Sequence, residues 1–258
     1  MLIDTHCHFY ESVFDCDREA LVKQSQSLGL SHLIMPNVDL ESLELMHACT
    51  QRYPDFCFPL IGLHPCSVRS DYMEVLKKLE SQWSSQVWVG IGEIGLDFYW
   101  SREFEKEQKD AFTLQIQWAV QHELPAIIHT RNSIETCLNI LESQIKLPKL
   151  IFHCFGESLE MAQRILKLNT QVMLGIGGVL TFKQSHLRET VKKLGINNLV
   201  LETDAPYLAP TPFRGKRNAP PYLFETLRVL SQVLELDSET IMQKTTQNAR
   251  LIFNTLPI

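Results

Sequence analysis

The 258-residue sequence lacks long apolar runs and any excess of basic residues. None of its apolar stretches approaches the about 20 residues that a membrane-spanning helix needs, and no basic segment followed by an apolar one suggests a secretory signal. We therefore expect a cytoplasmic protein without a membrane partner. The net charge of −6 and the pI near 5.9 argue against binding nucleic acid by broad electrostatic attraction. They leave a nuclease possible, because metal ions can neutralise phosphate locally.

The sequence also lacks any cysteine pattern typical of a disulfide framework. The number of cysteines is odd and no Cys-x-x-Cys motif occurs. The seven positions are Cys7, Cys16, Cys49, Cys57, Cys66, Cys137 and Cys154. This usage favours a reducing compartment, in agreement with the cytoplasm.

Short apolar runs recur along the chain, and each is followed by an amphipathic stretch. Buried parallel strands read as continuous apolar runs, whereas the helices between them show a 3.6-residue period. The predicted strands are Leu2–Thr5, His32–Met35, Cys57–Leu63, Val87–Glu93, Ala126–His129, Leu150–His153, Val172–Gly175 and Leu199–Glu202. The helical patterns include Asp17–Leu28, Leu40–Arg52, Glu103–Gln121, Ser133–Glu142, Leu159–Leu168 and Asp237–Phe253. Such alternation over about 250 residues predicts an α/β protein with a (β/α)8 TIM barrel, and a doubly wound open sheet is the alternative.

No linker or low-complexity segment interrupts this pattern. Proline gathers only in 209–212 and 219–221, which we interpret as one long loop after the eighth strand. A single domain over residues 1–258 is the simplest interpretation.

Polar residues that can bind metal fall at the C-terminal ends of the apolar runs. His6 and His8 are one residue apart, so an extended chain would aim both imidazoles to the same side. Each candidate alone has a plainer interpretation, such as an edge-strand histidine, a hydrogen-bonded structural histidine, a loop acid or a turn former. In a barrel, however, all strand ends meet at the rim where active sites are built. The candidates are His6, His8, Glu93, His129, His153 and Asp204.

This set is larger than one catalytic ion needs. A catalytic Zn²⁺ normally takes three protein ligands and a water, whereas two ions bridged by a carboxylate would use four histidines and two acids. The sequence therefore predicts two divalent cations. Zn²⁺, Mn²⁺ and Co²⁺ stay open, and several imidazoles make an all-Mg²⁺ site less favoured.

The ordered set of motifs resembles the TatD-type metal-dependent deoxyribonucleases, a branch of the amidohydrolase-like barrels. The resembling segments are Asp4-Thr5-His6-Cys7-His8, Gly62-Leu63-His64-Pro65, Gly92-Glu93-Ile94-Gly95-Leu96-Asp97, His129-Thr130-Arg131, His153-Cys154-Phe155, Leu201-Glu202-Thr203-Asp204-Ala205-Pro206, Arg214-Gly215-Lys216-Arg217-Asn218 and Thr246-Gln247-Asn248-Ala249. They run from residue 2 to about residue 253, nearly the whole chain. Mild departures at Asn132-Ser133 and at Ala219-Pro220-Pro221 touch the expected substrate rim and leave substrate preference open.

The resemblance implies a two-metal barrel that hydrolyses phosphodiester bonds in DNA, with single strands or 3′ ends as the substrate. The implied ligands of one ion are His6, His8, Glu93 and Asp204. Those of the other are Glu93, His129 and His153, with Glu93 bridging.

For the mechanism we expect in-line attack of a metal-activated water, with Asp204 and Glu93 as the catalytic residues. Asp204 is the candidate general base, and pure ligation is its alternative role. His64 would donate to a phosphate oxygen, or it is a structural histidine, and Glu202 could orient a ligand histidine. Arg131 offers a fork suited to phosphate, or it pairs with an acid such as Asp97.

Two further groups lie near the expected rim. Arg214, Lys216 and Arg217 form a basic cluster that either contacts phosphates or is a solvated loop. The aromatic run Phe98-Tyr99-Trp100 either stacks on an unpaired base or packs under its loop.

Two other functions are compatible with these residues. The same centre could hydrolyse a carboxylic ester or amide, as in a D-aminoacyl-tRNA deacylase. Alternatively, the chain could be a metal-binding scaffold without catalysis. We infer no obligate protein partner and take a monomer as the default.

Overall fold

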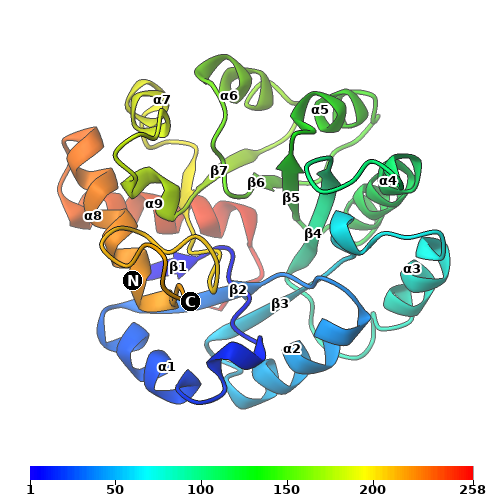
Figure 1. Cartoon of the computed structure of the whole chain (residues 1–258), viewed down its shortest axis with the longest axis horizontal. Coiled ribbons are helices and arrows are strands. Elements are labelled where there is room, and N and C mark those ends of the chain that lie inside the picture. The colour runs from blue at the N-terminus through cyan, green and yellow to red at the C-terminus, as the bar shows by residue number, and fades with distance from the viewer. Residues whose placement is uncertain (258) are drawn as a thin grey trace.

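The strands form one eight-stranded parallel sheet whose spatial order follows the sequence (Figure 1). The computed structural model describes residues 1–257. The strands are β1 (Leu2–Asp4), β2 (Leu30–Met35), β3 (Cys57–Ile61), β4 (Gly90–Asp97), β5 (Ala126–Arg131), β6 (Leu150–Phe152), β7 (Val172–Ile176) and β8 (Leu199–Leu201). A doubly wound sheet would reverse direction at a switch point, so the order excludes that alternative. The predicted (β/α)8 barrel is confirmed.

The two ends of the sheet meet through the chain that follows β1 and β8. Thr5 N–H donates to Leu201 O at 3.0 Å, and His8 N–H donates to Ala205 O at 2.8 Å. Asp204 N–H donates to His6 O at 2.9 Å. These bonds nearly close the barrel and place His6 and His8 directly beside Asp204.

Helices alternate with the strands and surround the sheet (Figure 1). They are α1 (Arg18–Ser27), α2 (Leu40–Arg52), α3 (Tyr72–Glu80), α4 (Glu105–Gln121), α5 (Ile134–Glu142), α6 (Leu159–Ile165), α7 (Leu187–Leu194), α8 (Leu223–Leu234) and α9 (Ser238–Ile252). Short 3-10 helices are η1 (Ser12–Phe14), η2 (Pro65–Ser67), η3 (Gly178–Thr181) and η4 (Pro220–Tyr222). No helix within residues 1–257 is long and apolar enough to cross a membrane.

The terminal helix α9 closes the barrel at the amino ends of the strands. Its last residue Ile252 and the following Phe253 join a buried cluster with inward-facing strand residues such as Ile3 and Val200. Asn248 donates to Leu199 O at 2.8 Å, which fixes the helix beside the start of β8. With apolar groups filling this end, polar side chains gather at the opposite, carboxyl end.

Strand β4 differs from its predicted bounds. The sequence predicted a strand over Val87–Glu93, but Val87 is 80% exposed and the strand begins at Gly90. It continues past Glu93 to Asp97, with an irregularity in its pairing to β5 between Ile91 and Ile94. Glu93 therefore lies within the strand rather than at its end. The carboxylate interrupts the apolar pattern because it faces the barrel interior.

Candidate metal centre and active site

The predicted ligands meet at the carboxyl end of the barrel. A cavity of about 400 Å³ opens there, and the side chains of His8, Glu93, His129, His153 and Asp204 line it. His64 and Arg131, predicted to bind substrate, line the same cavity. His6 is fully buried beneath it. Residues separated by almost 200 positions in the sequence thus share one site.

One group of ligand atoms forms where the segment after β1 meets β4 and β8. His6 Nε2 lies 3.2 Å from His8 Nε2 and 3.2 Å from Glu93 Oε2. Asp204 Oδ1 lies 3.5 Å from His6 Nε2 and 3.6 Å from His8 Nε2. Two imidazole nitrogens and two carboxylate oxygens therefore surround one point.

A second group forms around the other oxygen of Glu93. Glu93 Oε1 lies 2.7 Å from His129 Nδ1 and 2.7 Å from His153 Nε2. These two nitrogens are 3.2 Å apart. Glu93 thus presents one carboxylate oxygen to each group.

The two carboxyl groups are held ionised despite their burial. Burial would raise the pKa of Glu93, but the charges of His153 and His6 outweigh it and hold the pKa well below its usual range. Burial likewise opposes ionisation of Asp204, and the hydrogen bond with His8 lowers its pKa below the ordinary value. Both groups are consequently available as anionic ligands or proton acceptors.

Hydrogen bonds to the far ring nitrogens decide which nitrogen of each imidazole offers a lone pair. Tyr10 Oη donates to Pro36 O at 2.9 Å and therefore accepts from His8 Nδ1 at 3.0 Å. Asp97 Oδ2 accepts from His129 Nε2 at 3.0 Å. Since a neutral imidazole carries one proton, His8 Nε2 and His129 Nδ1 present lone pairs to the site when the rings are neutral. Burial opposes protonation of His129, but its hydrogen bonds with Asp97 and Glu93 raise its pKa to about 9, so a bound metal would displace a proton from this ring. Such outer partners commonly orient metal-binding histidines.

His64 has the opposite arrangement. Its Nδ1 accepts the backbone N–H of Cys66 at 3.0 Å, at the start of η2. In the neutral ring the proton therefore sits on Nε2, which lies 3.5 Å from Glu93 Oε1 and faces the cavity. This side chain offers a hydrogen-bond donor to the site rather than a lone pair.

Glu202 lies behind the ligand histidines. It is fully buried, and burial raises its pKa well above the usual value. His6 Nδ1, His153 Nδ1 and Glu202 Oε2 are all buried without a hydrogen-bond partner within residues 1–257. Donor atoms of these three residues lie within 4.8 Å of one another. Gly175 leaves the necessary room, because a Cβ there would lie 2.1 Å from Glu202 Oε2.

Two of the sequence-based alternatives are settled by contacts. Arg131 does not pair with Asp97, whose carboxylate binds His129 and Tyr99 N instead. The Arg131 guanidinium lies 3.7 Å above the centre of the Tyr99 ring. In the basic cluster, Arg217 binds Asp17 through two nitrogens and therefore has a structural contact.

Sequence reasoning missed Tyr10 and the partnership of Asp97 with His129. Tyr10 is 3% exposed, and nothing in its neighbourhood in the sequence marks it as a partner of His8. Asp97 belongs to the segment 92–97 that resembles the family, but its hydrogen bond with His129 depends on the extension of β4. A predicted β4 that continued to Asp97 would have revealed this contact.

Comparison with known proteins agrees with this geometry. The sequence model of a family described as TatD related DNase matches residues 3–254. The chain belongs to this family. It is 33% identical over 255 residues to YabD of Bacillus subtilis, an uncharacterised metal-dependent hydrolase, with 98% of this chain and 99% of the relative covered.

Other relatives extend the comparison. A protein of Pectobacterium carotovorum named 3′-5′ ssDNA/RNA exonuclease TatD is 28% identical over 259 residues, covering 98% of this chain and 99% of that one. The crystal structure of YjjV, a TatD homologue from Escherichia coli K12, superimposes with a TM-score of 0.87 at 29% identity, covering 98% of both chains. The chain is thus a metal-dependent hydrolase of the TatD family.

Proposed function

We propose that this protein hydrolyses phosphodiester bonds of DNA at a centre of two divalent cations. Single strands, attacked at 3′ ends, are the proposed substrate class. The observation that carries the proposal is the placement of Glu93, whose two oxygens face two separate groups of histidine nitrogens. The exonuclease name of the Pectobacterium relative supports the same substrate class.

The residues of the first group have the spacing of a divalent-ion site. Tetrahedral coordination at bond lengths of about 2.1 Å places neighbouring ligand atoms about 3.4 Å apart. His6 Nε2 lies 3.2 Å from His8 Nε2, 3.2 Å from the Glu93 oxygen and 3.5 Å from the Asp204 oxygen. His8 Nε2 lies 3.6 Å from the Asp204 oxygen and 3.7 Å from the Glu93 oxygen. His8 and His129 also direct lone pairs to the site, as metal ligands must.

We assign the ligands accordingly. His6, His8, Glu93 and Asp204 would hold one ion. Glu93, His129 and His153 would hold the second. The donor set of imidazoles and carboxylates suits Zn²⁺, Mn²⁺ or Co²⁺ better than Mg²⁺ alone.

When bound, such ions lower the pKa of water and neutralise charge on phosphoryl oxygens. The protein's own groups supply the rest of the chemistry. Asp204 is ionised, its side chain is 13% exposed to the cavity, and its carboxylate accepts the proton of the attacking water. His64 donates its Nε2 proton in a hydrogen bond to a non-bridging phosphate oxygen.

A paired assay tests the substrate class. Metal-loaded protein is incubated with 3′-labelled single-stranded DNA and, separately, with a D-aminoacyl-tRNA. We expect shortening of the DNA and an intact aminoacyl ester. Deacylation with intact DNA would instead assign the centre to carboxylic ester hydrolysis.

Glu93→Gln tests whether the centre is catalytic. It keeps the size of the side chain but removes the charge that binds both groups, so we expect loss of metal and near-complete loss of cleavage. The control is Glu44→Gln, which removes an exposed charge on α2, away from both the centre and the cavities beside it. A Glu93→Gln variant with full function would identify a scaffold rather than an enzyme.

A further inference from the structure

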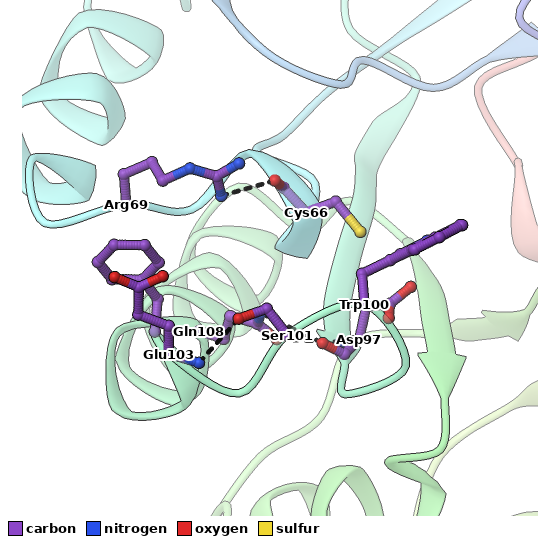
Figure 2. Close-up of a pocket in the computed structure, with 8 residues that line it drawn as sticks. Cys66, Arg69, Asp97, Trp100, Ser101, Glu103 and Gln108 are labelled. Carbon is purple, nitrogen blue, oxygen red and sulfur yellow. Dashed lines mark hydrogen bonds between the residues drawn. The ribbon is translucent and has the colours of Figure 1, made fainter.

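A second cavity adjoins the proposed active site. It has a volume of about 350 Å³, at the lower end of the about 300–1,000 Å³ typical of small-molecule sites. Figure 2 shows it between Arg69 on one side and Trp100 on the other, and Phe104 also lines it. Cys66, Asp97 and Trp100 also line the metal-centre cavity, so these three residues form the shared wall. A ligand in the second cavity would therefore lie next to the proposed scissile bond.

The shared wall carries exposed aromatic surface. Trp100 is 71% exposed and Tyr99 is 52% exposed, whereas Phe98 at 9% packs beneath them. The two exposed rings meet edge to face, with centroids 4.9 Å apart. The sequence left open whether this run stacks or packs. Phe98 packs, and the other two rings remain available for contact.

An arginine lines each of the two cavities that the shared wall separates. Arg131 lies above Tyr99 at 3.7 Å and 5.3 Å from the Trp100 ring centre, on the side of the metal centre. Arg69 lines the second cavity, where its Nη1 donates to Cys66 O and Val68 O. Neither guanidinium makes a salt bridge with a carboxylate within residues 1–257. The carboxylates of Asp97 and Glu103 also line the second cavity, and that of Asp97 is bonded to His129. In a chain of net charge −6, one unpaired guanidinium in each of the two cavities beside an exposed indole favours an anionic, aromatic ligand.

We propose that the second cavity binds the nucleotide next to the scissile phosphate, with its base stacked on Trp100. Arg131 and Arg69 contact the phosphates on either side of that base. Stacking does not depend on base identity, so this subsite makes the enzyme prefer unpaired strands without selecting a sequence. The inference deepens the proposed function and rests on a nucleic-acid substrate.

Fluorescence of the metal-loaded protein tests the stacking directly. The probe is a short phosphorothioate oligothymidylate, which resists hydrolysis. Trp88 and Trp118 are 5% and 4% exposed, and Trp83 is partly buried against Trp118. The part of the quenching that disappears in Trp100→Ala therefore reports on Trp100. We expect quenching in the wild type and its loss in Trp100→Ala.

The affinity of the same variant gives the size of the effect. Since stacking on an aromatic side chain contributes about 1–3 kcal/mol per base, Trp100→Ala should raise the Kd for the probe by about 5- to 150-fold. Trp100→Phe should retain most of the affinity. An abasic oligomer of equal length should bind both proteins alike. Ile145→Ala, which removes an exposed apolar side chain between α5 and β6, is the matched control.

A charge-matched pair tests the phosphate contact. Arg69→Gln and Lys146→Gln each remove one positive charge, but Lys146 lies between α5 and β6, away from the cavity. We expect only Arg69→Gln to weaken binding and to reduce its dependence on salt, by about 0.7 in the slope of log K against log salt concentration.

The results separate this inference from the proposed function. Unchanged fluorescence, or equal affinity of Trp100→Ala and wild type, overturns the stacking site even if the wild type cleaves DNA. Quenching and weakened binding without cleavage of ordinary DNA would keep the site and overturn the proposed catalysis. Equal effects of Arg69→Gln and Lys146→Gln overturn the phosphate contact.

Discussion

At the scale of single residues, the centre depends on where each imidazole carries its proton. His8 and His129 each donate one ring N–H to an oxygen and face Glu93 with the other nitrogen. His64 accepts a backbone N–H and so turns a donor toward the same carboxylate. Identical side chains thus acquire different chemical roles from their outer partners.

Asp97 is the outer partner whose removal is most informative. Asp97→Ala leaves His129 Nε2–H without its acceptor, so we expect metal affinity to fall by about 10- to 100-fold. Asp97→Asn keeps one acceptor oxygen and should recover part of the loss. Metal titration by calorimetry measures both, with Asp110→Asn on α4 as the control. Equal affinities in all of these proteins would refute the positioning role.

His64 allows a separation of substrate binding from metal binding. We expect His64→Ala to lower kcat by about 100-fold or more, because a donor to phosphate is lost, while the bound metal per chain stays unchanged. His129→Ala should instead lose metal. Elemental analysis together with steady-state kinetics distinguishes the two, and metal loss from His64→Ala would make His64 a ligand.

At the scale of elements, close contact between β4 and β5 positions both Glu93 and His129. Gly95 has φ +142°, and a Cβ there would lie 2.0 Å from His129 O. Its substitution by alanine must therefore move one strand away from the other. Because Gly95 has no side chain, β4, which carries Glu93, can lie close to β5, which carries His129.

Gly95→Ala is expected to lower the free energy of unfolding by more than about 1 kcal/mol, since the substitution combines a positive φ with a backbone clash. Gly215 also has a positive φ, +83°, but nothing lies within 4 Å of its Cβ position. Gly215→Ala should therefore be less harmful. Urea denaturation compares the two, and equal losses would show that the clash is relieved without cost.

The loop after β8 is tied to α1 by a two-point ion pair. Arg217 Nη1 lies 3.0 Å from Asp17 Oδ1, and Arg217 Nη2 lies 2.5 Å from Oδ2. The hydrogen bond from Arg217 lowers the pKa of Asp17 below 3.8. A depressed carboxyl pKa adds stability above the unfolded value, and this stability is lost as the pH falls through the folded value.

Asp17→Asn should therefore lower stability at pH 7 by at most about 1 kcal/mol, because the pair is partly exposed. The difference from wild type should persist above pH 3.8 and shrink below it. Thermal unfolding at several pH values measures this difference. A difference that grows toward acidic pH would contradict the assignment.

Most strands and helices could be predicted because apolar runs and amphipathic stretches alternate regularly. Strands β1, β3 and β5–β8 begin at the predicted residues, and α2 has the predicted bounds. The end of β4 could not be predicted, because a polar residue such as Glu93 marks the end of a strand in a pattern of buried apolar residues, whereas this carboxylate faces the barrel interior. Local sequence does not reveal that the interior of this strand is polar.

At the scale of the whole molecule, the candidate site was predictable because barrel topology brings strand ends together. Each of the predicted ligands follows or interrupts an apolar run, and the fold gathers all of them. Tyr10, Asp97 as the partner of His129, and the cavity around Trp100 were not predictable in this way. They depend on how loops turn after the strands, and no periodic pattern encodes those paths.

Anomalous scattering from crystals of metal-loaded protein tests the central claim most directly. The account predicts two peaks, one beside His6, His8 and Asp204 and the other beside His129 and His153, with Glu93 contacting both. The absorption edge would identify the metal. A single peak, or two peaks of which either lies away from Glu93, would contradict the two-metal centre.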